Sequence, residues 1–476
     1  MANGFDDELR VIDLHDINLD FKHSIAGKWS IDGHEVIGDL IRKDNQMCLK
    51  FKAEEEDLEE WAPDITKVTG MTRRGISIVL MKNVGYSTGP QNKEIFLYFK
   101  TAIFGYDFFD TDRSIEDFEI QFQKIGKLYN TRSLDIDFQD DEVKIGNLLP
   151  ESSFRYGADE LKIKHSINGR SSEDEMRVYF RREFSFSVKE PISVEQLDDY
   201  IIDFGLAFSF CIKDVPKVSR LVITKDKKPY HVMTDLSILS RTLEGVAHDP
   251  SITLKKHPEY VKKLFMNWPK FIEMNSHCIK RYIPIRVEHD TDIEEKVISL
   301  VKILECLVKD WKEDYSHPGE SEEEIDAIIK KLEEKINTET WDKKKSKKVK
   351  EVLLRHGIEK GVDDIVRDIF SELGISNINR VIAKLIMHFR FVYEGDSENL
   401  LPVLIATCIN LRNVEAHGGK RERQDYYMLL AARNLLMVLI DSVILENNMF
   451  GINEIEDIVC ETFHWHFYSR PILPRS

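Results

Sequence analysis

The spacing of apolar residues changes along the chain, from alternation with polar residues in the first half to helical spacing after Asp290. Alternation places every second side chain on one face of a strand, whereas spacings of three and four residues place side chains on one face of a helix. The strongest alternation lies in Met176–Val188, where apolar residues share one face and Arg181 and Arg182 stand near its middle. The pattern predicts a β-rich part followed by a helical part.

Runs of β-branched and aromatic residues between Gly, Asp and Asn predict further strands. These are Glu35–Arg42, Met47–Lys52, Ile76–Lys82, Ile95–Thr101, Ile115–Gln123, Glu160–Ile167, Arg220–Thr224 and Tyr230–Val232. Ser193 is expected to open one helix among them, because Leu197, Ile201 and Phe204 follow it at helical spacing. We expect residues 20–240 to form a β-sandwich or a strongly curved sheet with one packed helix.

The predicted fold class is α+β, with a β-rich N-terminal domain at 1–249, a helical junction and linker at 250–290, and an all-α bundle at 291–476. Within the junction, His257–Cys278 has helical spacing, whereas Tyr282–Arg286 contains a proline and is expected to be extended. Thr291 and Glu294 have the spacing of a capping box for a helix that ends near Trp311.

Charge and cysteine usage limit the classes of function. The 476 residues carry a formal net charge of −17, which argues against coating nucleic acid through overall charge but permits a local basic site. The six cysteines include no C-x-x-C pair and no regular spacing, so we expect buried thiols and neither a zinc ribbon nor a disulfide framework. No secretory signal and no charge-free run of membrane-spanning length is present, which predicts a cytoplasmic protein that does not bind membranes.

One polar motif stands between the two most apolar helical segments, Leu400–Leu411 and Tyr426–Leu445. Arg412 and Asn413 follow the first segment, His417 comes five residues after Arg412, and two glycines then let the chain turn. A histidine titrates near neutral pH and transfers protons, while an arginine presents a fixed charge with donors suited to phosphate oxygens. The motif therefore suits acid–base chemistry on a phosphate ester.

The Arg-Asn-x-x-x-His signature between two apolar helices resembles the HEPN superfamily, and the N-terminal SIAGKWSIDGHEVIGDLIRKDNQMCLKF resembles the opening of ApeA-type anti-phage proteins. The resemblance implies a metal-independent endoribonuclease without a cofactor, in which the Arg412 and His417 sets of two subunits meet in a homodimer or higher even oligomer. It also implies abortive infection by cleavage of host RNA, with tRNA as the leading candidate. The N-terminal domain would be regulatory and would sense a phage-encoded trigger.

The expected reaction is RNA transesterification. His417 would remove the proton of a ribose 2′-hydroxyl or donate one to the leaving 5′-oxygen, and Arg412 would stabilise charge on the phosphorane-like transition state. The products implied by the resemblance are a 2′,3′-cyclic phosphate and a 5′-hydroxyl. Because one histidine cannot easily act on both sides of the phosphorus, two copies across a dimer axis fit the chemistry.

Five further residues are candidates for supporting roles. Asn413 either hydrogen-bonds the turn or contacts the substrate. Glu305, on an otherwise apolar helical face, could orient the catalytic pair or simply lie at the polar edge of its helix. Lys420, Arg421 and Arg423 could bind RNA phosphates near the cut, or form the solvated start of the next helix.

Two other classes of function stay open. Arg412 and His417 could merely cap a helix C-terminus, where positive charge is favourable, in a non-catalytic dimerisation or interaction module. The chain could also bind nucleotides or transfer nucleotidyl groups, which would depend on magnesium. The lysine cluster Lys343–Lys350 follows an acidic stretch, and His464 and His466 flank a tryptophan without further metal ligands nearby, so neither is assigned a role.

Overall fold

The computed structural model describes residues 24–43, 46–52, 65–72, 75–89, 94–107, 109, 114–129, 135–139, 142–146, 152–171, 176–234, 250, 252–287, 292–307, 407–408, 411, 426–451, 453–455 and 457–459. The chain forms two compact units. The first comprises residues 1–243 and 252–270, and the second comprises residues 244–251 and 271–476.

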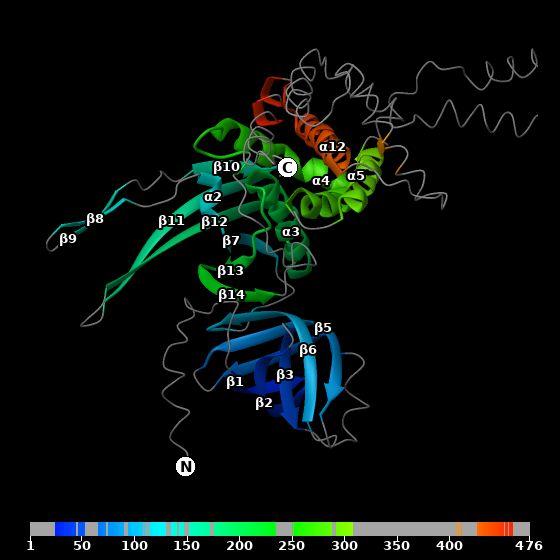
Figure 1. Ribbon diagram of the computed structural model, residues 1–476. Coiled ribbons are helices and arrows are strands. Elements are labelled where there is room, and N and C mark those ends of the chain that lie inside the picture. Colours follow the sequence, from blue (N-terminus) through cyan, green and yellow to red (C-terminus); the bar gives the residue numbers. More distant parts are fainter. Residues whose placement is uncertain are drawn as a thin grey trace, which may run out of the picture. The chain divides into compact units, whose positions relative to one another are not determined.

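Six antiparallel strands of the first unit close into a barrel (Figure 1). They are β1 (Ile25–Ile31), β2 (His34–Lys43), β3 (Gln46–Lys52), β4 (Lys67–Thr72), β5 (Ser77–Thr88) and β6 (Glu94–Gly105). Around the barrel the order is β6, β3, β2, β1, β4 and β5, and β5 pairs again with β6. Asp32 and Gly33 connect β1 to β2 with positive φ at both residues, which is the backbone that a tight two-residue hairpin needs.

Trp29 of β1 packs into the barrel core with only 1 % of its surface exposed. Its Nε1 donates a hydrogen bond to the backbone oxygen of Gly38 at 2.9 Å, so the buried indole donor is satisfied. The ring lies against Gly70 of β4, where a Cβ atom would come within 2.2 Å of Trp29 Cε3. The remaining core consists of apolar side chains that include Ile25, Ile31, Leu40, Met47, Leu49, Phe51, Val68, Ile78, Leu80, Ile95, Leu97 and Phe99.

We expect Gly70→Ala to destabilise the first unit by about 1–3 kcal/mol or more, because the added methyl group forces the Trp29 ring to move within a packed core. Urea unfolding followed by tryptophan fluorescence measures the change. Gly126→Ala is the matched control, since a Cβ at that position meets only Arg182 Nη1 at 3.5 Å. An unfolding midpoint of Gly70→Ala equal to that of the wild type would contradict this packing.

The sheet continues beyond the barrel through β6, because Thr101–Phe104 of β6 also pairs with β14. The order from there is β14, β13, β7, β12, β11 and β10, which completes one antiparallel sheet of twelve strands. The bounds are β7 (Ile115–Phe122), β10 (Ser152–Tyr156), β11 (Asp159–Ser171), β12 (Met176–Ile192), β13 (Val218–Lys225) and β14 (Lys228–Thr234). A separate two-stranded hairpin consists of β8 (Asp135–Gln139) and β9 (Glu142–Gly146).

Strands β11 and β12 extend past their neighbours as a two-stranded ribbon (Figure 1). Strand β10 pairs only with residues 159–163 of β11, and β7 pairs only with residues 184–192 of β12. The pairing of β11 with β12 nevertheless continues to Ser171 and Met176. The short helix α2 (Gly126–Tyr129) lies at the base of this ribbon, where the Tyr129 hydroxyl is 3.4 Å from Nε2 of His165.

Helix α3 (Val194–Ile212) packs its apolar side against the open part of the sheet. The ring centroid of Phe204 lies 4.9 Å from both Phe184 and Phe186 of β12. The helix begins with the predicted cap: the Ser193 hydroxyl accepts from the Gln196 backbone nitrogen at 3.2 Å, and the Gln196 side chain accepts from the Ser193 backbone nitrogen at 2.8 Å.

These elements confirm every strand predicted from alternation and the helix opened by Ser193. Of the two predicted arrangements, the curved sheet is found and the β-sandwich is wrong, because β5 pairs with both β4 and β6 and closes the sheet on itself. Five strands were not predicted, namely β1, β4, β8, β9 and β10. The β-rich part is followed by helices, as the predicted fold class requires.

Helix α4 (Pro258–Val287) is continuous, so the expectation of an extended segment at Tyr282–Arg286 is wrong. Pro284 removes one backbone donor from the helix interior. Burial compensates for this loss, because Tyr282 and Ile283 have no exposed surface. The first part of α4 belongs to the first unit, where Trp268 Nε1 donates to the backbone oxygen of Asp203 at 3.0 Å.

The second unit contains α5 (Ile293–Leu307) and α12 (Tyr426–Asn447) beside the last turns of α4. The start of α5 is held by Asp292, whose Oδ1 accepts from the Glu294 backbone nitrogen at 2.9 Å, and the predicted cap residue Thr291 lies outside the described residues. The apolar residues at helical spacing along α5 are all buried: Val297, Leu300, Val301, Leu304 and Leu307.

Candidate functional site

The candidate catalytic residues lie between two helical stretches of the second unit. Thr407, Cys408 and Leu411 are helical before the motif, and α12 begins at Tyr426 after it. Arg412, Asn413, His417, Lys420, Arg421 and Arg423 themselves lie outside the described residues. Their roles therefore stay predictions, while the second predicted apolar helix is confirmed from Tyr426 to Asn447.

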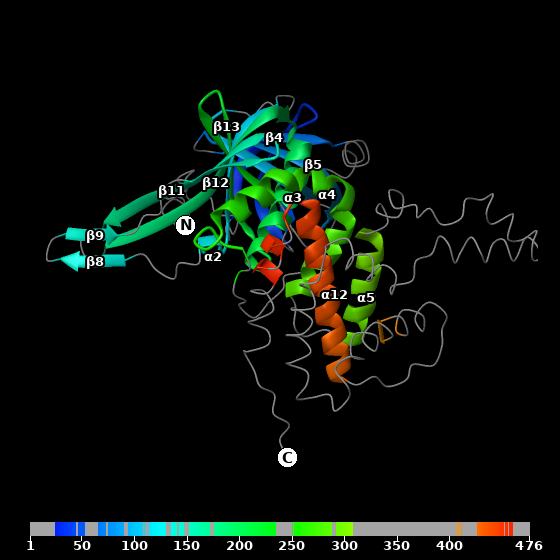
Figure 2. The ribbon, with the colours of Figure 1, turned by 90° about the horizontal axis from the view of Figure 1, so that it is seen from above.

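The helix that follows the motif is packed tightly against α5, and the two lie side by side in both views (Figure 2). From Leu435 to Leu445 every residue of α12 is buried. Such burial on all sides is typical of a central helix in a bundle. The helix that follows the candidate motif in the sequence is therefore firmly packed.

Three polar side chains from α4 and α12 form a buried cluster in the second unit. Asp441 accepts hydrogen bonds from the Tyr282 hydroxyl at 2.5 Å and from Arg286 Nη2 at 3.0 Å. Only 1 % of the side-chain surface of Arg286 and of Asp441 is exposed. Burial, followed by the negative charge of Asp441, raises the pKa of Tyr282 well above its ordinary value, so the phenol stays protonated and donates.

This cluster fixes how α12 packs along α4. Buried charges are tolerated only where partners satisfy them, so any sliding of α12 would leave Arg286 and Asp441 unpaired. From the sequence, Arg286 was expected in an extended segment, and Asp441 was given no role. The available sequence signal was a single carboxylate inside an otherwise apolar helix, which predicts a buried cationic partner.

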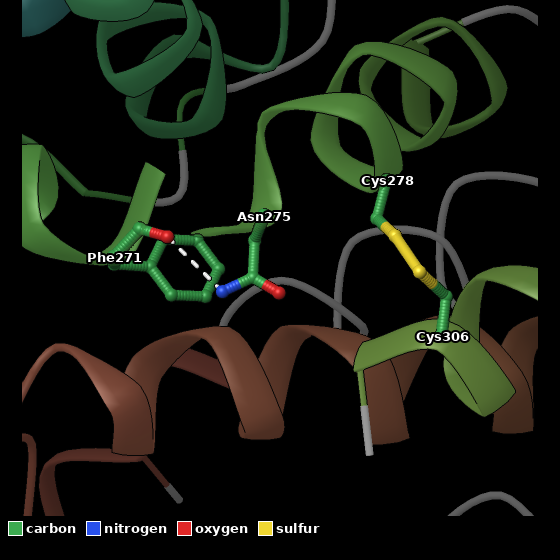
Figure 3. The surroundings of a disulfide bond; sticks show 4 residues. All are labelled: Phe271, Asn275, Cys278 and Cys306. Carbon is green, nitrogen blue, oxygen red and sulfur yellow. Dashed lines mark hydrogen bonds between the residues drawn. A yellow bond between two sulfur atoms is a disulfide. The ribbon is translucent and has the colours of Figure 1, made fainter. Parts of the chain in front are cut away.

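Cys278 of α4 and Cys306 of α5 form a disulfide bond, with their Cα atoms 6.8 Å apart (Figure 3). The expectation that all six cysteines are buried thiols is therefore wrong for this pair. Their separation by 28 residues in the sequence gave no regular pattern to detect. The expectation of buried thiols is confirmed for Cys48, Cys211 and Cys408, none of which is in a disulfide, and Cys460 lies outside the described residues.

Glu305 stands next to the disulfide on α5 and is half-buried. Its predicted role was to orient Arg412 or His417. Because both partners lie outside the described residues, that contact stays a prediction. Its neighbour Cys306 is covalently tied to α4, so the backbone that carries Glu305 is held in place.

Arg433 is a further cationic residue near the start of α12 that the sequence analysis did not single out. Its Nη2 and Nε donate to the side-chain oxygen of Asn434 at 3.0 and 3.2 Å. Burial lowers the pKa of Arg433 from its ordinary value. Two helical turns separate Arg433 from Tyr426, the first residue of α12. The available sequence signal was a basic residue within an otherwise apolar helix.

The described residues lack two kinds of feature. No helix among them is long and apolar enough to cross a membrane. No group of three or more His, Cys, Asp or Glu side chains within the described ranges is arranged to hold a metal ion.

The N-terminal part of the chain matches a known protein family. The family model for ApeA N-terminal domain 1 matches residues 24–273, which include the barrel, the open sheet, α3 and the first part of α4. No curated protein and no solved structure shows significant similarity to the chain. Since the match covers more than half of the 476 residues, the chain belongs to the ApeA family and to the context of anti-phage defence.

Proposed function

We propose that this chain is a metal-independent HEPN endoribonuclease that acts in anti-phage defence by cleaving host RNA, with tRNA as the leading candidate. The observation that carries the proposal is the Arg412-Asn413-x-x-x-His417 motif between two apolar helical segments, in a chain whose N-terminal half belongs to the ApeA family. The regulatory role falls to the N-terminal unit, which would restrain the nuclease and raise its activity when a phage-encoded trigger binds.

The reaction proposed is attack of a ribose 2′-oxygen on the adjacent phosphorus. One His417 takes the proton of the 2′-hydroxyl, the new bond from the 2′-oxygen to phosphorus forms, and the bond to the 5′-oxygen breaks. A second His417 donates a proton to the leaving 5′-oxygen. The products are a 2′,3′-cyclic phosphate and a 5′-hydroxyl, and the substrate itself supplies the nucleophile.

Two subunits are required by this chemistry. The base and the acid act on opposite sides of the phosphorus, and one imidazole cannot reach both positions in one step. A homodimer or higher even oligomer brings two Arg412 and His417 sets to one phosphodiester. Arg412 then stabilises the negative charge that develops on the phosphorane-like transition state through its fixed guanidinium donors.

The neighbouring residues have supporting roles in this proposal. Asn413 holds the turn that carries the motif, and Glu305 orients the catalytic pair from α5. Lys420, Arg421 and Arg423 bind phosphates near the cut without reading bases. The Arg286–Asp441 pair and the Cys278–Cys306 bond support the proposal indirectly, because they fix two of the helices on which these residues depend.

The ends of the RNA products test the reaction. We expect cleavage of tRNA by the purified protein to continue at an undiminished rate in EDTA, because the 2′-oxygen replaces a metal-bound water as nucleophile. Mass spectrometry of the fragments is expected to find 2′,3′-cyclic phosphate and 5′-hydroxyl ends. Loss of cleavage in EDTA would favour the nucleotidyl-transfer alternative, and 5′-phosphate ends would exclude the mechanism.

A further inference from the structure

Two lysines, one just before helix α2 and one within it, converge on one buried carboxylate in the first unit. Lys124 Nζ lies 2.8 Å from Asp214 Oδ1, and Lys127 Nζ lies 2.6 Å from Asp214 Oδ2. The carboxylate is nearly buried, whereas the side chain of Lys124 keeps 41 % of its surface exposed. One carboxylate balances only one of the two positive charges, so the group as a whole remains cationic.

Two other segments bring more lysines to the same place. The backbone nitrogen of Leu254 donates to the backbone oxygen of Leu128 in α2 at 2.7 Å, and the exposed Lys255 and Lys256 follow directly. The backbone nitrogen of Gln123 donates to the backbone oxygen of the exposed Lys217 at 2.8 Å. These lysines come from different parts of the sequence and are placed together by the fold.

The base of the β11–β12 ribbon adds an arginine. The guanidinium carbon of Arg182 lies 4.9 Å from the centroid of the Tyr129 ring at the end of α2, a distance at which a cation and an aromatic face attract each other. The ring is itself held by the contact of its hydroxyl with His165. Arg182 is therefore fixed beside the lysines.

We propose that the basic patch formed by Lys124, Lys127, Arg182, Lys217, Lys255 and Lys256 binds the phosphate backbone of the RNA substrate. Asp214 pairs with two of these cations, Lys124 and Lys127, in a chain whose net charge is −17. Gathering like charges costs stability through repulsion, and a bound polyanion relieves it. The inference rests on the proposed function, because that function supplies RNA as the substrate.

The composition of the patch favours RNA over an acidic protein surface. Five of the six cations are lysines, which contact phosphates as point charges and do not read bases. Such contacts suit an enzyme that binds many different RNA molecules at this patch, whatever their sequence. The patch belongs to the first unit, whereas the proposed cleavage residues belong to the second, so binding and cleavage can be disabled separately.

The test is binding of fluorescently labelled tRNA to the full-length chain carrying His417→Ala, measured by anisotropy. We expect Lys217→Glu, Lys255→Glu and Lys256→Glu together to weaken binding at least about tenfold at moderate salt. The slope of log affinity against log salt should fall in magnitude by about 2, since each phosphate contact contributes about 0.7 for a single strand. Lys124 and Lys127 are left unchanged because they hold Asp214.

A matched control separates a local effect from overall charge. Lys28→Glu, Lys52→Glu and Lys100→Glu change the net charge equally, and all three residues are exposed on strands of the barrel. We expect this control to bind tRNA within about twofold of the parent at the same salt. Equal weakening in both triple variants, or wild-type binding in the patch variant, would overturn the proposal. The second result would leave an acidic protein partner as the occupant.

The readout also distinguishes this inference from the proposed function. If His417→Ala still cleaves RNA, the assignment of the catalytic histidine fails, yet a binding defect confined to the patch variant would still support the patch. If His417→Ala stops cleavage while the patch variant binds tRNA normally, the nuclease proposal stands and the patch proposal fails.

Discussion

His417→Ala is expected to lower the rate of RNA cleavage by about 10²–10⁴-fold or more, because general acid–base catalysis typically contributes that factor and the proposed site uses the residue twice. The 2′-hydroxyl would keep its proton at neutral pH, and the leaving 5′-oxygen would depart as an alkoxide. Cleavage of labelled tRNA under single-turnover conditions measures the change. Size-exclusion chromatography with light scattering should find the same oligomer as in the wild type.

Two variants make this result specific. His277→Ala removes an exposed histidine from α4 and should leave cleavage unchanged, which controls for loss of a histidine as such. Arg412→Lys keeps the positive charge but loses the planar pair of donors, so we expect activity to fall while RNA binding persists. A His417→Ala protein that cleaves at the wild-type rate would exclude His417 as a catalytic residue.

The sheet was partly predictable because alternation records which face of a strand is buried. Strand β12 shows it clearly, since the buried Phe184, Phe186 and Val188 alternate with serines. Strand β4 has the sequence KVTGMT, in which Gly70 occupies the position against Trp29. Glycine has no side chain that could contribute to the alternation. A glycine needed for close packing therefore makes its strand harder to recognise from the sequence.

In the second unit, a local sequence signal led to a wrong prediction for one helix. Helical spacing located α5 and α12 correctly, but Pro284 suggested that α4 ended early. Tertiary packing overrides the tendency of proline to end a helix here. The segment after Pro284 brings Arg286 into contact with Asp441 of another helix. The Cys278–Cys306 bond was missed for the same reason, since partners far apart in sequence are recognised only after helices have been packed.

The candidate site was located from the sequence because its chemistry is concentrated in one short motif. Arg412 and His417 could be assigned roles from residue type and position between two helices. The supporting parts were not visible in this way. The basic patch beside α2 collects residues from four separate segments, and the buried Tyr282, Arg286 and Asp441 cluster joins two helices that are distant in sequence.

Asp441→Ala is expected to destabilise the second unit by about 3–5 kcal/mol, the usual consequence of leaving a buried charge without its partner. Arg286 would keep its positive charge with 1 % of its side chain exposed, and the Tyr282 hydroxyl would lose its closest acceptor. The melting temperature of this unit should fall by about 6–20 °C, given about 2–4 °C for each kcal/mol in a unit of this size. Differential scanning calorimetry measures the shift.

The double variant Arg286→Met with Asp441→Leu separates burial of an unpaired charge from loss of packing. Replacing both partners by apolar side chains of similar size is often neutral for stability, so we expect the double variant to melt well above Asp441→Ala. Tyr282 would still donate to the backbone oxygen of Met437, which lies 3.3 Å away. If the double variant were as unstable as Asp441→Ala, the pair would matter for its shape and not for its charges. If Asp441→Ala cost less than about 1 kcal/mol, the typical net value of one ordinary hydrogen bond, the cluster could not be what fixes α12 against α4.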